Sequence, residues 1–553
     1  MPDFTQHNSP LQVFTPLPEN TLLATSLRGR EEMGGSYSFQ VDLIARPGVS
    51  IDFSRLLGAE ARVRLSLPGG AVRTYSGIIA QFGQRDGDQV FDRYCMVLRP
   101  AIHQLALVRR SRIFHQQSAA QIIDKLLEPV FANSTMKTRN FAGHTPVRAY
   151  CTQYRETDWD FLRRLSAESG VTWYWIHQPE VRTFKLTDNT SVGAPGLGTI
   201  HYARSQGGST ATTRIHGWEL DQSICPQGME VLDHHFQVAG QEILGDAHPP
   251  EVVRAGGLHL KPSKVHAPSQ QDDMSSARFF DGVNPAGGHD SSALPTMFSA
   301  APDQAEIGMR GALAGTVRAV ATGNCCQMAP GHSFTLAGHP NQDGEWVVVN
   351  AEHTVEVEGR FWAGEPCALR AEVRAECAPL SLRQAIWPVP PRPNIGGVLT
   401  GTVIGPTGQE IHLDKFGRVQ VRFPWDRDNP STSCWVRVAQ SWAGHGWGAC
   451  FWPRVGHEVV VAFENGDPDR PIVVGSVYNS DNMPPFPLPE NRFIAGWKSL
   501  TEGGDPSKNF HQILMSDEKQ GQVLHIHAEK TLIAQQESRQ VSIRPNLDMT
   551  IQG

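Results

Sequence analysis

The sequence lacks the cysteine patterns that indicate covalent or metal cross-links. Its nine cysteines are scattered, odd in number, and form no Cys-x-x-Cys pair. Zinc knuckles and disulfide frameworks both depend on regularly spaced cysteines, so neither is predicted. The pattern favours free thiols in a reducing compartment.

Signals for membrane insertion and for Sec-type export are also missing. Residues 1–20 contain no basic segment followed by an apolar one, which excludes an ordinary signal peptide. No run of about 18 apolar residues occurs, the length that a membrane-spanning helix needs. If the protein leaves the cell, we expect a route that its N-terminus does not encode.

There is no excess of positive charge. The chain has 49 lysines and arginines against 56 aspartates and glutamates, a formal net charge of −7. General binding to polyanions depends on surplus Lys and Arg, so this balance argues against a nucleic-acid-binding protein. A chain of 553 residues is too long for a single hydrophobic core, so several domains are predicted. The 52 glycines and 39 prolines favour short strands joined by turns.

Motifs of the common enzyme classes are absent as well. The sequence has no His-Glu-x-x-His, no Gly-x-Ser-x-Gly and no phosphate-binding loop. The nearest string, GHEVVVAF at 456–463, lacks the second histidine and has the alternation of a strand. We therefore expect no catalytic residues and no cofactor.

The first part of the chain contains strand patterns and two capped helices. Residues 22–45 alternate apolar and polar residues around glycine-containing turns. Ser118 and Gln121 form a capping box ahead of an apolar helical face. A second helix is predicted between Thr157 and Gly170.

The middle of the chain is less regular. Residues 187–300 show little periodicity and contain runs such as DGVNPAGGHDSSALP at 281–295, which indicate loops. Strand patterns resume at 333–357.

Residues 394–482 have the pattern of a small antiparallel barrel. The stiff linker PVPPRP at 388–393 precedes them. Five segments then alternate apolar and polar residues, which is typical of the OB-fold barrel. Within them, Asn465-Gly466 predicts a tight hairpin turn.

Near the C-terminus the alternation returns in a more polar context. Leu524, Ile526 and Ala528 lie on one face of a predicted strand, and His525 and His527 lie on the other. Strands so few and so polar cannot form a core alone. Three chains winding together would bury the apolar face, so the pattern predicts a homotrimer with Leu524, Ile526 and Ala528 at its axis.

Ordered motifs along nearly the whole chain resemble one known family. KFGRVQVRFPWDRD at 415–428, the segment 433–479 and LHIHAEK at 524–530 resemble the central signature of VgrG, the spike protein of bacterial type VI secretion. RSRIFHQQSAAQIIDKLL at 110–127 and YRETDWDFLRRLSAESGVTWYW at 154–175 resemble its hub domains. The family is similar to the hub and spike proteins of contractile phage tails.

The resemblance implies a fold that is mainly β with some α: a hub of barrel-like domains, an OB-fold barrel and the start of a trimeric β-helix needle. In chain order we expect a first hub barrel at 1–115, an α+β hub segment at 116–190, a second hub barrel with loop insertions at 191–387, the OB-fold domain at 394–482, and a neck with a short start of the triple-stranded β-helix at 494–553.

The resemblance also implies partners and a location. Family members form homotrimers that cap a tube of the protein Hcp, carry a PAAR-repeat tip protein and effectors with their adaptors, and contact baseplate components. We therefore expect a structural spike that punctures target membranes on sheath contraction. It would reside in the bacterial cytoplasm before firing and be secreted without a signal peptide into the medium or a target cell. The alternative is a cell-wall-degrading spike enzyme with an unrecognised site in residues 190–300.

The tryptophan-rich and arginine-rich stretch 415–471 allows two interpretations. Aromatic rings and arginines on an OB-fold can bind single-stranded nucleic acid. The many carboxylates in the same unit favour packing and Arg–carboxylate pairs within and between chains instead. We therefore expect no nucleic-acid partner and assign a structural signature to the barrel: Gly417, Arg418, Trp425, Asp426, Trp435, Gly466, Asp467 and Pro468.

His525 and His527 also raise the question of a metal. They share one face of the predicted strand, and three chains would bring six imidazoles together. Because the apolar face would occupy the axis, both histidines would lie in solvent. We therefore expect no metal, with His525 and His527 as the alternative candidates.

Overall fold

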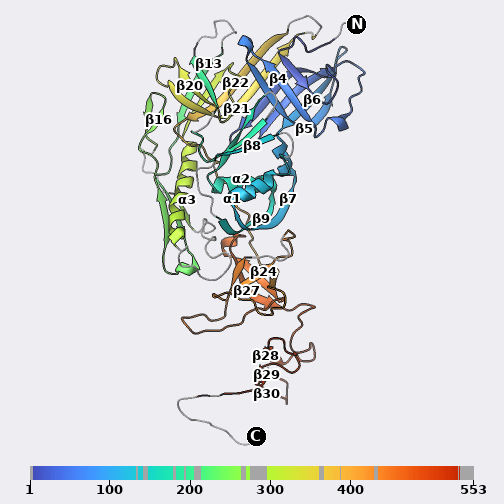
Figure 1. The fold of residues 1–553 in the computed structure, drawn as a ribbon, viewed down its shortest axis with the longest axis vertical. Helices are drawn as coiled ribbons and strands as arrows, with labels where there is room; N and C mark the ends of the chain where they lie inside the picture. The colour runs from blue at the N-terminus through green and yellow to red at the C-terminus, as the bar shows by residue number, and fades with distance from the viewer. Residues whose placement is uncertain are drawn as a thin grey trace.

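Figure 1 shows a computed structural model of the chain, an elongated molecule with a wide hub (residues 4–386), a small barrel beneath it (399–477) and a narrow neck (494–527). The structure describes residues 4–131, 135–140, 147–178, 182–191, 195–204, 213–262, 270–273, 295–359, 361, 367–386, 388–428, 434–533 and 535. None of the described helices is long and apolar enough to cross a membrane.

A twelve-stranded sheet runs through the hub and contains two groups of strands. The first group pairs in the antiparallel order β1-β4-β5-β6-β3-β2. Its members are β1 (Leu11–Phe14), β2 (Leu23–Glu32), β3 (Tyr37–Ala45), β4 (Glu60–Ser66), β5 (Val72–Arg85) and β6 (Asp92–Arg99). Tyr37, Phe39 and Val41 are buried at alternate positions, which confirms the predicted strand pattern.

The second group closes on itself. Its order is β21-β20-β12-β13-β19-β22, and β22 pairs back to β21, so that six strands form a ring. They are β12 (Gly196–Tyr202), β13 (Arg214–Gln222), β19 (Val317–Gly323), β20 (Ser333–Ala337), β21 (Gly344–Glu358) and β22 (Ala368–Pro379). Residues 350–356 of β21 also pair with β2, so one long strand joins the two groups.

An α+β segment lies between the hub sheet and the barrel (Figure 1). Its elements are β7 (Arg109–Ser118), α1 (Ala119–Leu127), β8 (Thr135–Asn140), β9 (Val147–Thr157), α2 (Asp158–Glu168), β10 (Thr172–His177) and β11 (Arg182–Thr187). Both helices begin as predicted, with the Ser118–Gln121 capping box on α1 and Thr157 as the cap of α2. Their buried faces join the core of the first strand group.

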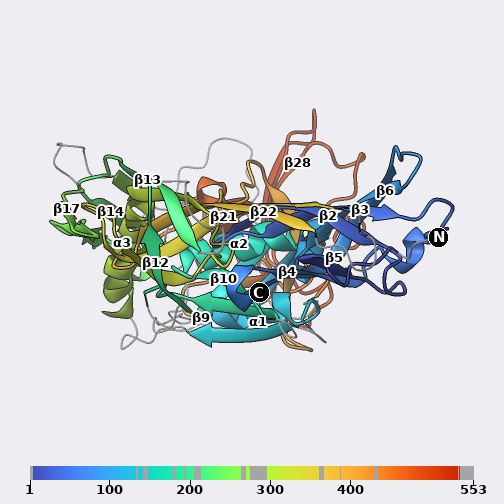
Figure 2. The same cartoon turned by 90° about the horizontal axis from the view of Figure 1, so that it is seen from above.

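Residues 223–314, which we call the arm, fold differently from the prediction. β14 (Met229–Asp233), β15 (Ile243–Ala247) and β18 (Gln270–Asp273) form a small sheet, β16 (Val253–Ala255) pairs with β17 (Leu258–Leu260), and α3 (Pro295–Ala314) packs on β14 and β15. Periodicity did not indicate these described strands, because each has only three to five residues. Most of 281–295 lies outside the described residues. Figure 2 shows the arm and β3, β5 and β6 at opposite ends of the hub.

The predicted closed barrel is confirmed, but it is not wholly antiparallel, since β25 and β27 pair in parallel. β23 (Leu399–Ile404), β24 (Val419–Arg422), β25 (Trp435–Val438), β26 (Glu458–Phe463) and β27 (Pro471–Val477) close in the order β23-β24-β25-β27-β26. Asn465 and Gly466 have φ of 52° and 73°, the left-handed conformation that the predicted turn between β26 and β27 requires.

The neck is a three-stranded antiparallel sheet of β28 (Ile494–Lys498), β29 (Gln512–Ser516) and β30 (Val523–His527). It lies at the narrow end of the molecule (Figure 1). Most of the predicted needle, residues 536–553, lies outside the described residues.

Candidate functional site

The barrel shares its hydrophobic core with the hub. Ile113 of β7 and Tyr154 of β9 belong to the same buried cluster as the barrel residues Val403 and Val421. The rings of Tyr154 and Trp425 meet edge to face with their centroids 5.4 Å apart. Removing this surface from water ties hub and barrel together. We call the contact of the barrel and its linker with residues 109–168 and 233–236 the joint.

A short barrel loop, Asp467-Pro468-Asp469, makes the polar contacts of the joint. The backbone N–H of Thr152 donates to Asp469 Oδ1 at 2.7 Å, and the Thr152 hydroxyl donates to the Pro468 carbonyl at 3.4 Å. Arg392, in the proline-rich linker, donates to Asp467 Oδ2 at 2.5 Å. The loop is therefore held by the hub on one side and by the linker on the other.

A buried cluster of opposite charges surrounds this loop. Arg164 of α2 contacts Glu156 at 2.8 Å and Glu168 at 3.1 Å, and Arg148 contacts Glu168 at 3.2 Å. The Nε of Arg392 lies 3.8 Å from Glu168. Together with the loop, the cluster holds three arginines and four carboxylates: Arg148, Arg164, Arg392, Glu156, Glu168, Asp467 and Asp469.

Burial and the neighbouring charges set the protonation of the cluster. Burial disfavours the charged form of Glu168, but Arg164, Arg392 and Arg148 outweigh burial and lower the pKa of that carboxyl. Burial raises the pKa of Asp469 to about 7; the neighbouring Asp467 adds to the rise, and Arg164 and Arg148 oppose it. Asp469 is therefore the carboxyl that takes up a proton near neutral pH.

The arm makes a second polar contact with the barrel. Arg470 donates to Asp233 Oδ1 at 3.0 Å and to the His234 carbonyl at 3.3 Å. Burial raises the pKa of Asp233 to about 6, against the opposing charge of Arg470.

An aromatic side chain of the arm completes this contact. The ring of Phe236 meets that of Phe416 edge to face at 5.2 Å. The guanidinium groups of Arg418 and Arg437 lie 5.5 Å and 5.2 Å from the centroid of Phe236. Phe236 is thus held by cation–π contacts from two arginines of the barrel.

Five of the eight predicted signature residues lie in the joint: Arg418, Trp425, Asp426, Asp467 and Pro468. Asp426 is buried, with a carboxylate oxygen 3.9 Å from Nε2 of His115 in β7. These residues hold the barrel on the hub of the same chain, a contact that strand periodicity cannot indicate.

The other three signature residues shape the barrel itself. Gly417 has a φ of 68° and lies against the Trp452 ring, where a Cβ would come within 2.3 Å. Trp435 packs on His412 at 4.9 Å. The Gly466 carbonyl accepts a hydrogen bond from the Ile395 N–H at 2.8 Å.

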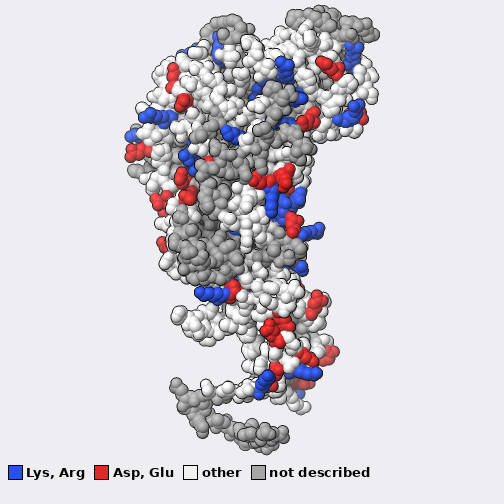
Figure 3. Space-filling view, viewed as in Figure 1, with Lys and Arg blue, Asp and Glu red and all other residues white. Residues whose placement is uncertain are grey.

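The tryptophans of the barrel differ in exposure, and its arginines pair with carboxylates. Trp425, Trp435 and Trp452 are half-buried, whereas Trp442 and Trp447 are 64% and 57% exposed. Arg–carboxylate pairs occur as expected, at Arg418–Asp414, Arg437–Glu464 and Arg454–Glu410. On the face seen in Figure 3, cationic and anionic side chains are interspersed.

The neck sheet presents one apolar face. In the strand register, Trp497, Ile513 and Ile526 lie in one row and Met515 lies beside Leu524 in the next. All five are exposed.

The predicted faces of the last strand are seen in this sheet. Leu524 and Ile526 share the apolar face, and His525 and His527 point to the other, where His527 packs on Phe510 at 4.7 Å. Ala528 follows the last residue of β30 and is half-buried. Among the described residues, no three His, Cys, Asp or Glu side chains are grouped as metal ligands would be.

A second buried charge cluster lies inside the hub, and no sequence motif indicates it. Glu31 of β2 contacts Arg73 of β5 at 2.5 Å, His177 of β10 at 3.2 Å and His353 of β21 at 3.1 Å. Burial disfavours the charged form of Glu31, but Arg73 and the histidines outweigh it and hold the pKa well below its usual range. The cluster therefore ties four strands together. A charged residue at an inward position of a strand is the one signal that could have found it.

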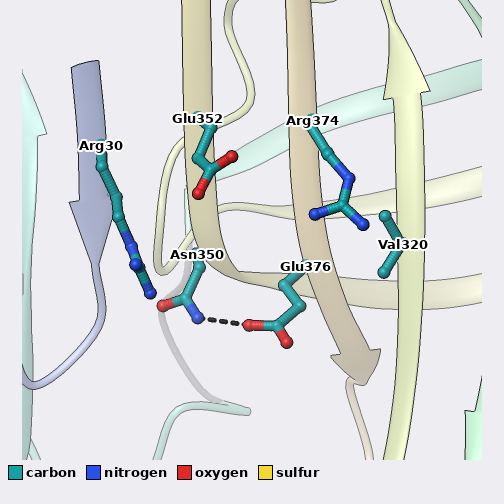
Figure 4. A pocket seen from close by; sticks show the side chains of 6 residues that line it. All are labelled: Arg30, Val320, Asn350, Glu352, Arg374 and Glu376. Atoms are coloured by element: carbon teal, nitrogen blue, oxygen red, sulfur yellow. Dashed lines mark hydrogen bonds between the residues drawn. The ribbon is translucent and has the colours of Figure 1, made fainter.

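A pocket of about 170 Å³ opens on the charged face of the hub sheet (Figure 4). Its lining residues are Arg30, Val320, Asn350, Glu352, Arg374 and Glu376. The two arginines balance the two glutamates, and Asn350 donates to Glu376. This lining contains no hydroxyl, thiol or imidazole that could act as a nucleophile, and no residue from 190–300.

Comparison with known families matches both parts of the molecule. Residues 30–359 match the phage tail baseplate hub (GPD) family, and residues 408–478 match the type VI secretion system/phage-baseplate injector OB domain. The spike protein VgrG1a of Pseudomonas aeruginosa is 32% identical over 94% of this chain and 77% of its own length. The spike protein VgrG1c of the same organism is 32% identical over 95% of this chain and 69% of its own length. A Vibrio cholerae relative named actin cross-linking toxin VgrG1 is 28% identical, and this chain covers 47% of it.

Solved structures share the fold. An E. coli protein, described as a type VI secretion component similar to the T4 bacteriophage tail proteins gp27 and gp5, superposes with a TM-score of 0.56 at 17% identity, covering 84% of this chain and 100% of that one. A chain of a Francisella PdpA–VgrG complex superposes with a TM-score of 0.55 at 9% identity, covering 94% of this chain and 88% of that one. With a hub match over most of the chain and a relative 32% identical over 94% of it, this chain belongs to the VgrG family of type VI secretion spike proteins.

Proposed function

We propose that the chain works as a homotrimeric spike that caps the Hcp tube, carries effectors and punctures target membranes. The observation that carries the trimer is the apolar face of the neck. Trp497, Ile513, Met515, Leu524 and Ile526 are 58%, 42%, 40%, 68% and 53% exposed in the single chain. A contiguous apolar face of this kind is typical of an interaction surface.

A threefold arrangement would remove this surface from water. Fully burying one large aliphatic or aromatic side chain contributes about 1.5–3 kcal/mol, and five such residues per chain would meet at one axis. Cyclic symmetry also closes the assembly, so that no apolar edge remains to recruit further copies. The histidines on the opposite face of β30 would then remain outside the axis.

The hub supports the tube-capping part of the proposal. Two strand groups joined by β21 give each chain two barrel-like units, and three chains would present six of them to a sixfold tube. The relative that was solved in complex with PdpA supports cargo binding.

We further propose that a PAAR-repeat protein, effector adaptors and baseplate components bind the assembled spike, and that it moves from the bacterial cytoplasm to the target without a signal peptide. Its action is mechanical and includes no catalytic step.

Light scattering on the purified full chain tests the trimer. We expect a mass three times that of the 60.8 kDa chain. Ile526→Asp should lower that mass, because three carboxylates would be buried together in an apolar axis, where desolvation and like charge both oppose them. The matched control is His525→Asp, one position away on the other face, which should leave the trimer intact. A monomeric wild-type chain would contradict the proposal, as would a trimer that tolerates Ile526→Asp.

A further inference from the structure

Residues 441–452 form an aromatic hairpin on the barrel, between β25 and β26. Its side chains Trp442, Trp447 and Phe451 are 64%, 57% and 61% exposed. The segment contains no Asp, Glu, Lys or Arg. Large exposed rings in a segment without charged residues are typical of the centre of a protein–protein interface.

Hydrogen bonds and close packing fix the shape of the hairpin. The Gly444 N–H donates to the Trp447 carbonyl at 2.9 Å, and the Ala449 N–H donates to the Trp442 carbonyl at 2.8 Å. The two indole rings meet edge to face at 5.0 Å. A Cβ on Gly444 would lie 2.3 Å from the Trp447 ring, so glycine is required for this arrangement. The rings are thus held in a set orientation before any partner binds, which lowers the entropic cost of binding.

The hairpin is continuous with the apolar face of the neck. Phe451 stacks on Trp497 of β28 with their centroids 6.4 Å apart and a 16° angle between the rings. Two further contacts fix the neck to the barrel. Arg454 donates to the Leu500 carbonyl at 2.5 Å, and the Gly503 N–H donates to Glu410 at 3.2 Å. Hairpin and neck therefore form one surface, and a molecule that covers one lies beside the other.

We infer that Trp442 and Trp447 are the contact by which each barrel binds a neighbouring copy of this chain. The inference rests on the trimer proposed above and adds a second interface to the neck face. Continuity with the neck selects a second copy as the partner. Threefold symmetry agrees, because each chain of a closed ring must present two different surfaces to its neighbours, and the hairpin supplies one of them.

Dilution of the trimer tests the inference. We expect the double variant Trp442→Ser/Trp447→Ser to dissociate at a protein concentration at least ten times higher than the wild-type chain, with unchanged monomer unfolding in urea. The control Trp442→Phe/Trp447→Phe keeps aromatic rings and should dissociate close to the wild-type concentration. A wild-type trimer whose Ser variant dissociates at the same concentration would overturn the hairpin contact alone. A wild-type monomer at all concentrations would overturn the proposed trimer as well.

A cysteine in the hairpin provides a second measurement. Cys450 is exposed, and the other eight cysteines are buried or half-buried. Alkylation of Cys450 by N-ethylmaleimide should be at least fivefold slower in the trimer than after dilution to the monomer. Cys450→Ser assigns the labelled site, since this variant should lose the fast reaction. Equal rates in trimer and monomer would count against the contact.

Discussion

The joint and the neck differ in the side chains that form their contacts. In the joint, arginines and carboxylates are buried and paired within one chain, around a core that hub and barrel share. In the neck, apolar side chains lie on an open sheet face. The contacts of the joint lie within a single chain, whereas the neck face would be buried only in the proposed trimer. The stability of the joint should therefore be independent of protein concentration, and that of the neck should depend on it.

This difference suits the proposed spike, which would carry force along its axis. The joint lies between the hub and the neck (Figure 1), so in the proposed spike axial load would cross it. Charged hydrogen bonds such as those of Arg164 and Arg392 are directional, and a small displacement breaks them. The apolar neck face allows different contacts as long as it stays buried. We therefore expect the joint to fix the angle between barrel and hub, and the neck to set the number of chains in the proposed trimer.

Loss of Arg164 should have the largest effect on the joint. Arg164 contacts Glu156, Glu168 and the Thr152 carbonyl from a fully buried position. Arg164→Ala leaves buried carboxylates without a counter-charge, which costs about 3–5 kcal/mol. Urea unfolding should show this loss equally at low and high protein concentration.

An exposed ion pair provides the matched control for this variant. Arg28 contacts Glu356 at 3.3 Å on the surface of the hub sheet. Arg28→Ala should change the free energy of unfolding by less than about 1 kcal/mol. If the effect of Arg164→Ala disappeared as protein concentration rose, the joint would not be complete within one chain.

Features encoded in consecutive residues could be predicted from the sequence. The capping box of α1, the Asn465-Gly466 turn and the alternating face of β30 each depend on residues within a few positions of one another. The alternation alone is therefore enough to select Leu524 and Ile526 as axis candidates. Ala528 extends the same alternation, but β30 ends at His527, so the register no longer fixes its face.

Features built by distant pairing could not be predicted in this way. Glu31 meets His353 across 322 positions, and Thr152 meets Asp469 across 317. No local period connects such residues. The signature residues of the barrel are recognisable as a set, but their contacts with β7, β9 and the arm emerge only when the chain is folded. Periodicity misses the strands of the arm because they have three to five residues.

The pH dependence of the joint should come from its two carboxyls with raised pKa, Asp233 and Asp469, and a substitution at Asp469 isolates the larger of the two shifts. The folded pKa of Asp469, about 7, lies above the ordinary value of 3.8, so the folded state binds the proton more tightly than the unfolded state. Its contribution to stability is therefore complete below pH 4 and is lost as pH rises toward 7. Asp469→Asn cannot ionise and still accepts the Thr152 hydrogen bond. Relative to the wild type, the free energy of unfolding of the variant should rise by up to about 1.4 kcal/mol per pH unit between pH 4 and 7.

Urea midpoints at pH 5, 6, 7 and 8 measure this difference. The gap between Asp469→Asn and wild type should widen up to pH 7 and then stay constant. Parallel profiles for the two proteins would show that a different carboxyl carries the surplus proton. None of the five large residues on the apolar face of the neck is titratable. The mass of the proposed trimer should therefore stay constant across the same pH range.

The smallest effect should come from the arm, whose contact with the barrel is peripheral to the charged cluster. Phe236→Ala removes two cation–π contacts of about 0.5–1 kcal/mol each, with Arg418 and Arg437. Phe236→Leu keeps apolar volume without the ring face, so the two variants together separate packing from cation–π attraction. Amide hydrogen exchange should speed up in β14 while α2 stays protected, because α2 belongs to the cluster and β14 to the arm. If both elements lost protection together, arm and cluster would open as one cooperative unit, and the joint would have to be described as a single contact.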